Sequence, residues 1–143
     1  MERRVLEPTL EDLRQILATS KTIAVVGLSN KPERPSHEVA SYLQDEGYRI
    51  IPVNPHITEV LGEKAYPSLR DVPKPVDIVD IFRRPESVPP IVEDAIAVGA
   101  KVVWMQSGIV NEEAAARAEA AGLTVIMDAC MRSAHRTLRA GRI

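Results

Sequence analysis

Apolar residues gather in short continuous runs along this chain, and polar segments rich in glycine and proline separate the runs. The runs show no alternation of apolar and polar positions, which is typical of parallel strands covered on both faces. Three of them begin one or two residues after a glycine, at Gly47, Gly99 and Gly122. The pattern predicts five parallel strands, at 22–26, 49–53, 76–82, 101–105 and 124–127.

The segments between these strands carry helix signals. Asn111 is a suitable N-cap, and Pro89 and Pro90 fall in a first turn, where a missing N–H group is harmless. A glycine just past a helix end supplies the left-handed conformation that turns the chain back into the sheet. Between strands two and three we expect only short helical turns, near 69–71 and 58–61. Full helices are expected at 9–19, 36–46, 87–98, 111–121 and 131–139.

The alternation of strands and helices predicts an α/β fold, a doubly wound, Rossmann-like parallel sheet of five strands. Right-handed crossovers are most simply arranged in the strand order 3-2-1-4-5, counted along the chain. Ligands of such sheets bind beyond the carboxyl ends of the strands, and this order puts the switch point between strands one and four. A chain of 143 residues has the length of one domain, which we expect to span residues 1–143.

Composition and charge narrow the class of protein. The formal net charge of −2 argues against bulk nucleic-acid binding. The chain has no run of 18 apolar residues that would predict a membrane span, and the first five residues carry no apolar signal segment. The single Cys130 excludes an internal disulfide and fits a reducing compartment. We therefore expect a cytoplasmic protein with neither a membrane nor a nucleic-acid partner.

The segment after the first predicted strand is a candidate phosphate site. The strand stops at Gly27, and a polar loop leads into a helix whose free N–H groups and positive dipole end favour an anion. A dinucleotide fingerprint, Gly-x-Gly-x-x-Gly, would place two more glycines here, but Ser29 and Pro32 occupy those positions. The alternative is an ordinary solvated turn. The candidate residues are Gly27, Ser29, Asn30, Lys31, Arg34 and Ser36.

The ends of strands two and three offer contacts for a nucleoside. Asn54 stands where a dehydrogenase would usually carry a carboxylate for the ribose hydroxyls, and an amide tolerates a phosphorylated ribose better. Pro55 gives a flat apolar surface for adenine. Arg83 and Arg84 can make bidentate phosphate contacts, although a charged surface loop is the alternative interpretation. The candidates are Val53, Asn54, Pro55, Phe82, Arg83 and Arg84.

Strand four ends in a further candidate binding turn, Gln106, Ser107 and Gly108. Gln106 offers both a donor and an acceptor. Gly108 lets a ligand approach the backbone closely.

No catalytic constellation or metal site stands out in the sequence. Ser107 has no local base, and His37, His56 and His135 are scattered, with no cysteine or carboxylate at ligand spacing. Cys130 lies near the predicted ligand edge, and a small buried side chain is the favoured interpretation. A reactive thiolate is the alternative. We expect neither a metal ion nor a catalytic residue.

Three short motifs follow one another along the chain: Val-Asn-Pro at 53–55, Phe-Arg at 82–83 and Trp-x-Gln-x-Gly at 104–108. Together with the segments 24–29, 34–36, 47–52 and 77–81, they closely resemble the small stand-alone bacterial CoA-binding proteins. Those proteins are similar in turn to the CoA-binding domain of the succinyl-CoA synthetase α subunit. The resemblance spans about residues 10–139 and implies a Rossmann-like, nucleotide-binding domain.

The resemblance also implies roles for individual residues. In that family the first loop holds the CoA phosphates, the ends of strands two and three surround the adenosine, and the strand-four turn borders the pantetheine arm. Carried over, these are Gly27, Ser29 and Lys31; Val53, Asn54 and Pro55; Phe82 and Arg83; and Gln106 and Gly108. The chain departs from the family pattern at Ala129, where the family usually has arginine, and at Ala134, where it tends to have glutamate. Any role of those two side chains does not carry over.

The leading hypothesis is a binding module for coenzyme A or a short acyl-CoA, a small-molecule ligand, without the ligase reaction. The synthetase's catalytic histidine lies in a second domain, outside the resemblance. One alternative is a small acyl-CoA-using enzyme with Cys130 or another group as nucleophile. A second is an NAD(P)-binding oxidoreductase, against which the missing glycines and Asn54 argue. The sequence predicts neither the acyl chain nor the oligomeric state.

Overall fold

The structure, a computed structural model, describes residues 9–73 and 75–140. Its strands are β1 Thr22–Val26, β2 Arg49–Val53, β3 Glu59–Val60, β4 Glu63–Lys64, β5 Ile78–Ile81, β6 Val102–Met105 and β7 Thr124–Ile126. Its helices are α1 Leu10–Thr19, α2 Pro35–Asp45, α3 Val88–Ala97, α4 Glu112–Ala120 and α5 Met131–Ala140, with 3-10 turns η1 Leu69–Asp71 and η2 Pro85–Ser87.

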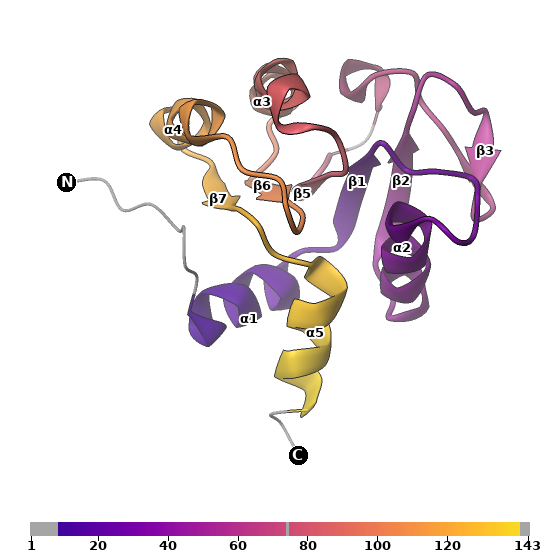
Figure 1. Cartoon of the computed structure of the whole chain (residues 1–143), viewed down its shortest axis with the longest axis horizontal. Helices are drawn as coiled ribbons and strands as arrows, with labels where there is room; N and C mark the ends of the chain where they lie inside the picture. Colours follow the sequence, from indigo (N-terminus) through magenta and orange to yellow (C-terminus); the bar gives the residue numbers. More distant parts are fainter. Residues whose placement is uncertain (1–8, 74, 141–143) are drawn as a thin grey trace.

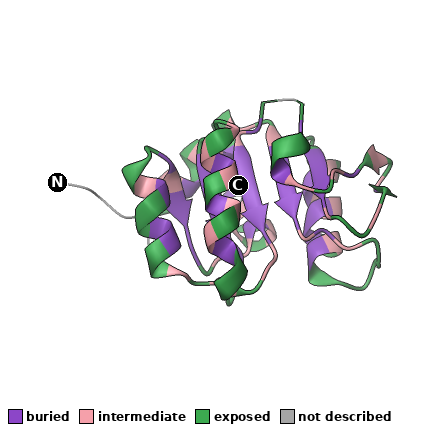
Figure 2. Ribbon diagram, turned by 90° about the horizontal axis from the view of Figure 1, so that it is seen from above, coloured by how far each residue is buried: buried purple, intermediate pink, exposed green. Residues whose placement is uncertain are grey.

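Five parallel strands form one sheet between two helical layers (Figure 1). Helices α1, α2 and α5 pack on one face of the sheet, and α3 and α4 pack on the other. The buried strands lie between helices whose outer faces are exposed (Figure 2). The predicted Rossmann-like α/β fold with a five-stranded parallel sheet is confirmed.

The strand order differs from the expected one. The sheet runs β2-β1-β5-β6-β7, so its five strands are ordered 2-1-3-4-5 along the chain, and the prediction 3-2-1-4-5 is wrong. Pro52 explains why β2 lies at the edge, since proline lacks the N–H group that a second neighbouring strand would need. Asp77 holds the start of β5 beside β1, because its carboxylate accepts from the N–H groups of Lys21 and Thr22, at 2.8 and 3.1 Å. The switch point therefore lies between β1 and β5, and not between strands one and four.

The connection between β2 and β5 contains a hairpin. Residues 58–61 do not form the expected helical turn, because β3 and β4 pair antiparallel there. Leu61 and Gly62 have φ angles of 55° and 75°, and two successive positive φ angles are the requirement of a type I′ hairpin turn. The N–H and C=O groups of Tyr66 then bond to the end of β2, at 3.0 and 2.9 Å, and cover part of its open edge. The turn predicted near 69–71 is confirmed as η1.

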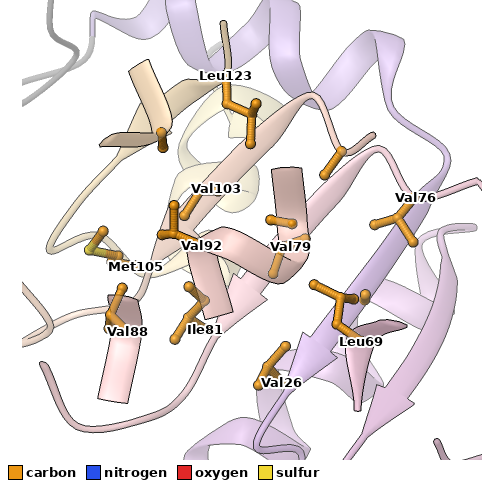
Figure 3. Close-up of a cluster of buried hydrophobic side chains, with 14 of the residues drawn as sticks. Val26, Leu69, Val76, Val79, Ile81, Val88, Val92, Val103, Met105 and Leu123 are labelled. Carbon is orange, nitrogen blue, oxygen red and sulfur yellow. The ribbon is translucent and has the colours of Figure 1, made fainter. Parts of the chain in front are cut away.

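Two aliphatic cores lie on the two faces of the sheet. The core under α3 and α4 takes alternate strand residues such as Val79 and Ile81, and Figure 3 shows Val26 and Leu69 at one end of it. The core under α1, α2 and α5 contains Trp104, whose indole N–H donates to a backbone carbonyl at 2.8 Å. Because strands are buried on both faces, their sequences are continuously apolar.

The predicted helix ends are confirmed. The side chain of Asn111 accepts from the N–H of Ala114 at 2.9 Å, as an N-cap does. Gly47, Gly99 and Gly122 have φ angles of 101°, 76° and 94°, the left-handed conformation that turns each chain segment back toward the sheet.

Within the described ranges, none of the helices is long and apolar enough to cross a bilayer.

Candidate functional site

The carboxyl ends of β1, β2 and β5 meet at one place. Val26 pairs with Val53 of β2 on one side and with Ile81 of β5 on the other, so three chain segments leave the sheet side by side. This is the switch point of the sheet, where open α/β sheets bind their ligands. Three of the predicted segments, 27–36, 53–55 and 82–84, begin here.

Gly27 lies in the crowded junction between β1 and β5. Its N–H donates to the carbonyl of Val53 at 2.9 Å, and its φ angle is 92°. A Cβ atom at this position would collide with the carbonyl oxygen of Phe82 and would lie 3.3 Å from Nε of Arg83. The sequence predicts that this glycine lets a phosphate approach the backbone, whereas in the structure the neighbouring strand already excludes a side chain.

Hydrogen bonds within the loop hold it in a defined shape. The buried hydroxyl of Ser36 accepts from the N–H of Ser29 at 3.0 Å, and the hydroxyl of Ser29 accepts from the N–H of Lys31 at 3.0 Å. The ring nitrogen Nδ1 of His37 lies 3.0 Å from the carbonyl oxygen of Ser29. Ser29 and Ser36 therefore shape the loop, while Asn30 is exposed at its tip.

Asn54 ties the end of β2 to this loop. Its side-chain amide donates to the carbonyl of Leu28 at 3.0 Å, and its side-chain oxygen accepts from the N–H of His56 at 2.9 Å. Both ends of the amide group thus have protein partners. An aspartate could not donate to Leu28. The hydrogen bond is therefore a structural reason for asparagine at position 54, in addition to the ribose argument made from the sequence.

A cleft of about 320 Å³ opens beside the loop, on the α3 face of the sheet. It is lined by Val26 and Val53 at the ends of β1 and β2, by Leu69 of η1 and by Ile91 of α3. The cleft contains three predicted site residues, Val53, Pro55 and Arg83. The other lining residues were not predicted from the sequence: Val26, Pro67, Ser68, Leu69, Ser87, Ile91 and Asp94. The spacing of residues 87, 91 and 94, which puts them on one face of the predicted helix, was the sequence signal that could have identified this wall of the cleft.

Four cationic side chains follow the strands whose ends meet at this cleft. Arg83 lines it and is half-buried, while Lys31, Arg34 and Arg84 are exposed nearby in sequence, at the ends of the same strands. No side chain of these four forms an ion pair with a residue in the described ranges. Unpaired guanidinium and ammonium groups at a helix N-terminus favour an anionic ligand.

The turn after β6 is organised differently. The side chain of Gln106 points into the protein, where its amide donates to Oδ1 of Asp80 at 2.6 Å, and it is 3% exposed. The N–H of Gly108 donates to the carboxylate of Asp128 at 2.7 Å. Ser107 is exposed, and Cys130 is half-buried at the start of α5. Residues 106–108 therefore do not line the cleft, and the Gln106 amide is already hydrogen-bonded inside the protein.

Asp80 is a buried carboxyl group that the sequence analysis did not single out. It lies on β5 between Val25 and Trp104 of the neighbouring strands and is fully buried. Burial raises its pKa to about 7, partly opposed by the hydrogen bond from Gln106. Its second oxygen, Oδ2, has no hydrogen-bond partner among the described residues. A single polar position within an apolar strand was the available signal.

A second hollow of about 310 Å³ lies between α1, α2 and α5. Its lining includes Tyr48, His135 and the ion pair of Arg139 with Glu46, and none of the predicted binding residues. No group of three or more histidine, cysteine, aspartate or glutamate side chains within the described ranges could hold a metal ion. The cleft at the switch point, in contrast, contains the predicted residues Val53, Pro55 and Arg83, and Arg83 is an unpaired cation among the described residues.

Comparisons with known proteins agree on one family. A family model described as "CoA binding domain" matches residues 21–136, which include every strand and the whole cleft. The uncharacterized protein YneT of Bacillus subtilis is 50% identical over 128 residues, covering 90% of this chain and 95% of YneT. A hypothetical protein from Pyrococcus horikoshii OT3 has 45% identity and a TM-score of 0.91, covering 97% of this chain and 98% of that chain.

A larger enzyme contains a related segment. The ADP-forming acetate–CoA ligase II of Archaeoglobus fulgidus is 32% identical over 120 residues, which cover 82% of this chain but 18% of the ligase. This chain therefore spans less than a fifth of that relative. The match to the family model over most of the chain, with the same fold in its relatives, shows that the chain belongs to the CoA-binding domain family.

Proposed function

We propose that this protein binds coenzyme A or a short acyl-CoA at the carboxyl ends of β1, β2 and β5. The observation that carries the proposal is the cleft of about 320 Å³ at the switch point, with apolar walls and an unpaired arginine. Ligand sites are mostly apolar concavities with a few polar groups that fix orientation. Membership in the CoA-binding domain family supports the choice of ligand.

Each part of the site suits one part of this ligand. The apolar sides formed by Leu69, Ile91 and Pro55 suit the two faces of an adenine ring. The guanidinium of Arg83 suits the ribose 3′-phosphate, which distinguishes CoA from NAD and NADP. The N-terminus of α2, with Lys31 and Arg34 in the loop before it, suits the pyrophosphate.

The proposal includes binding without chemical conversion of the ligand. The ligase relative shares with this chain only the segment that forms 18% of its length. Cys130, the candidate nucleophile, lies at the start of α5, on the β6–β7 half of the sheet edge and away from the residues that line the cleft.

Isothermal titration with four ligands tests the proposal: CoA, acetyl-CoA, 3′-dephospho-CoA and NADP. We expect saturable binding of CoA and acetyl-CoA, weaker binding of 3′-dephospho-CoA and no measurable binding of NADP. The dephospho ligand controls for the 3′-phosphate contact, and NADP controls for a general dinucleotide site. Saturable binding of NADP with none of CoA would refute the proposal. Release of free CoA or acetate from acetyl-CoA during the titration would refute binding without conversion.

A further inference from the structure

We propose that Asp94 selects adenine among the purine bases by accepting a hydrogen bond from its exocyclic amino group. The inference rests on the proposed binding of CoA and assigns a specificity-determining residue within that site. It is carried by the position of Asp94 in the cleft and by its hydrogen bonding.

Asp94 lies at the inner end of the cleft. Ser87, the N-cap of α3, and Ile91 and Asp94 within the helix line it at positions i, i+4 and i+7, so this wall extends about 10 Å along the helix axis. Helix α3 begins at the carboxyl edge of the sheet and runs back along it, which places Asp94 two turns inside. A ligand whose ribose 3′-phosphate lies at Arg83 would therefore extend its base toward Asp94.

An ion pair orients the Asp94 carboxylate. Its Oδ1 accepts from Nε of Arg70 at 2.6 Å, and the Asp94 side chain is 27% exposed. No described residue donates to its Oδ2. A carboxylate anion accepts hydrogen bonds and cannot donate. The inner end of the cleft thus presents a fixed acceptor beside the apolar side chains of Leu69 and Ile91.

This arrangement discriminates between purines at their 6-position. Adenine carries an amino group there, which donates, whereas hypoxanthine and guanine carry a carbonyl oxygen, which accepts. Two acceptors facing each other repel, and each also loses its bond to water. Leu69 and Ile91 contact ring faces, which these bases share, so apolar packing alone does not separate them. The acceptor of Asp94 supplies the difference.

The test compares CoA with its analogue in which hypoxanthine replaces adenine, each titrated into three proteins. We expect the unmodified protein to bind CoA about tenfold more tightly than the analogue. Asp94→Asn should bind CoA within about threefold, because the amide oxygen still accepts, and should bind the analogue better, because the amide N–H donates to its carbonyl. Glu93→Gln is the control, since Glu93 pairs with Arg117 outside the cleft, and it should keep the tenfold ratio.

The outcomes separate this inference from the proposed function. Equal affinity of the unmodified protein for both ligands, or the same ratio in Asp94→Asn as in the unmodified protein, overturns the role of Asp94 while CoA binding stands. A ratio that falls equally in Glu93→Gln also overturns it, because charge alone would then explain the effect. Failure of both ligands to bind any of the three proteins overturns the proposed CoA binding itself.

Discussion

The two halves of the sheet's carboxyl edge use their polar groups in opposite ways. At β1, β2 and β5 a cleft opens, and Arg83 has no ion-pair partner among the described residues. At β6 and β7 the polar groups bond to one another: Gln106 donates to Asp80, and Gly108 donates to Asp128. The first half leaves its charges available, whereas the side chain of Gln106 and the N–H of Gly108 in the second half already have partners within the protein.

This difference indicates where binding energy can arise. A ligand that meets an unpaired cation gains a charge-assisted hydrogen bond without breaking an existing one in the protein. A ligand at Gln106 would have to displace the bond to Asp80, which would leave a buried carboxyl group without a partner. We therefore expect substitutions in the cleft to change ligand affinity, and substitutions at the β6–β7 end to change mainly stability.

The largest effect is expected for Gly27→Ala. A methyl group at this position would collide with the carbonyl of Phe82, and the φ angle of 92° is strained for alanine. We expect a loss of about 4 kcal/mol or more in the free energy of unfolding, with loss of CoA binding, because β1 and β5 must separate. Urea unfolding and CoA titration measure the two effects.

Gly108→Ala is the matched control in the other half. Its φ angle of 82° is also positive, but a Cβ atom there would meet no heavy atom within 4 Å. Only backbone strain is introduced, so we expect about 1 kcal/mol of destabilisation. Equal destabilisation by the two substitutions would show that the Phe82 carbonyl does not restrict Gly27.

Asp80→Asn should change how stability depends on pH. Burial raises the pKa of the Asp80 carboxyl to about 7, so between pH 4 and 7 the unfolded chain releases a proton that the folded protein keeps. The free energy of unfolding should therefore fall as the pH rises through this range and level off above it. The difference is on the order of 4 kcal/mol at most. The asparagine variant should lack this slope, and parallel urea-unfolding profiles of the two proteins from pH 4 to 8 would contradict the assignment.

Local signals in the sequence predicted the elements of the fold well. Asn111 and the glycines that end helices act through contacts a few residues away, so their roles are visible in the sequence. The strand order depended on Asp77 and Pro52, whose partners lie far along the chain or on the sheet edge. The inner cleft was missed for the same reason, because Asp94 approaches Arg70 only after α3 packs on η1.

Arg83→Ala tests the cleft half directly. We expect CoA affinity to fall by about 10- to 100-fold, which corresponds to the loss of one charge-assisted contact of about 1.5–3 kcal/mol. The affinity for 3′-dephospho-CoA should change little, because that ligand lacks the phosphate that Arg83 is proposed to bind. Arg84→Ala is the control, since Arg84 is exposed and does not line the cleft, and it should weaken CoA by only a few-fold. Equal weakening of both ligands by Arg83→Ala would place Arg83 on the pyrophosphate or away from the ligand.

The smallest effect is expected for Cys130→Ser, at the β6–β7 end. Cys130 packs against the core under α1, α2 and α5, and its backbone carbonyl accepts from the N–H of Ala134 at 3.0 Å. The substitution exchanges one small side chain for another outside the cleft, so CoA affinity should stay within about threefold in titration. If the protein were instead an acyl-CoA-using enzyme with this thiol as nucleophile, incubation with acetyl-CoA would add an acetyl group at Cys130. The mass of the intact protein distinguishes the two cases, since an acetyl adduct that Cys130→Ser abolishes would replace the binding role with a transfer reaction.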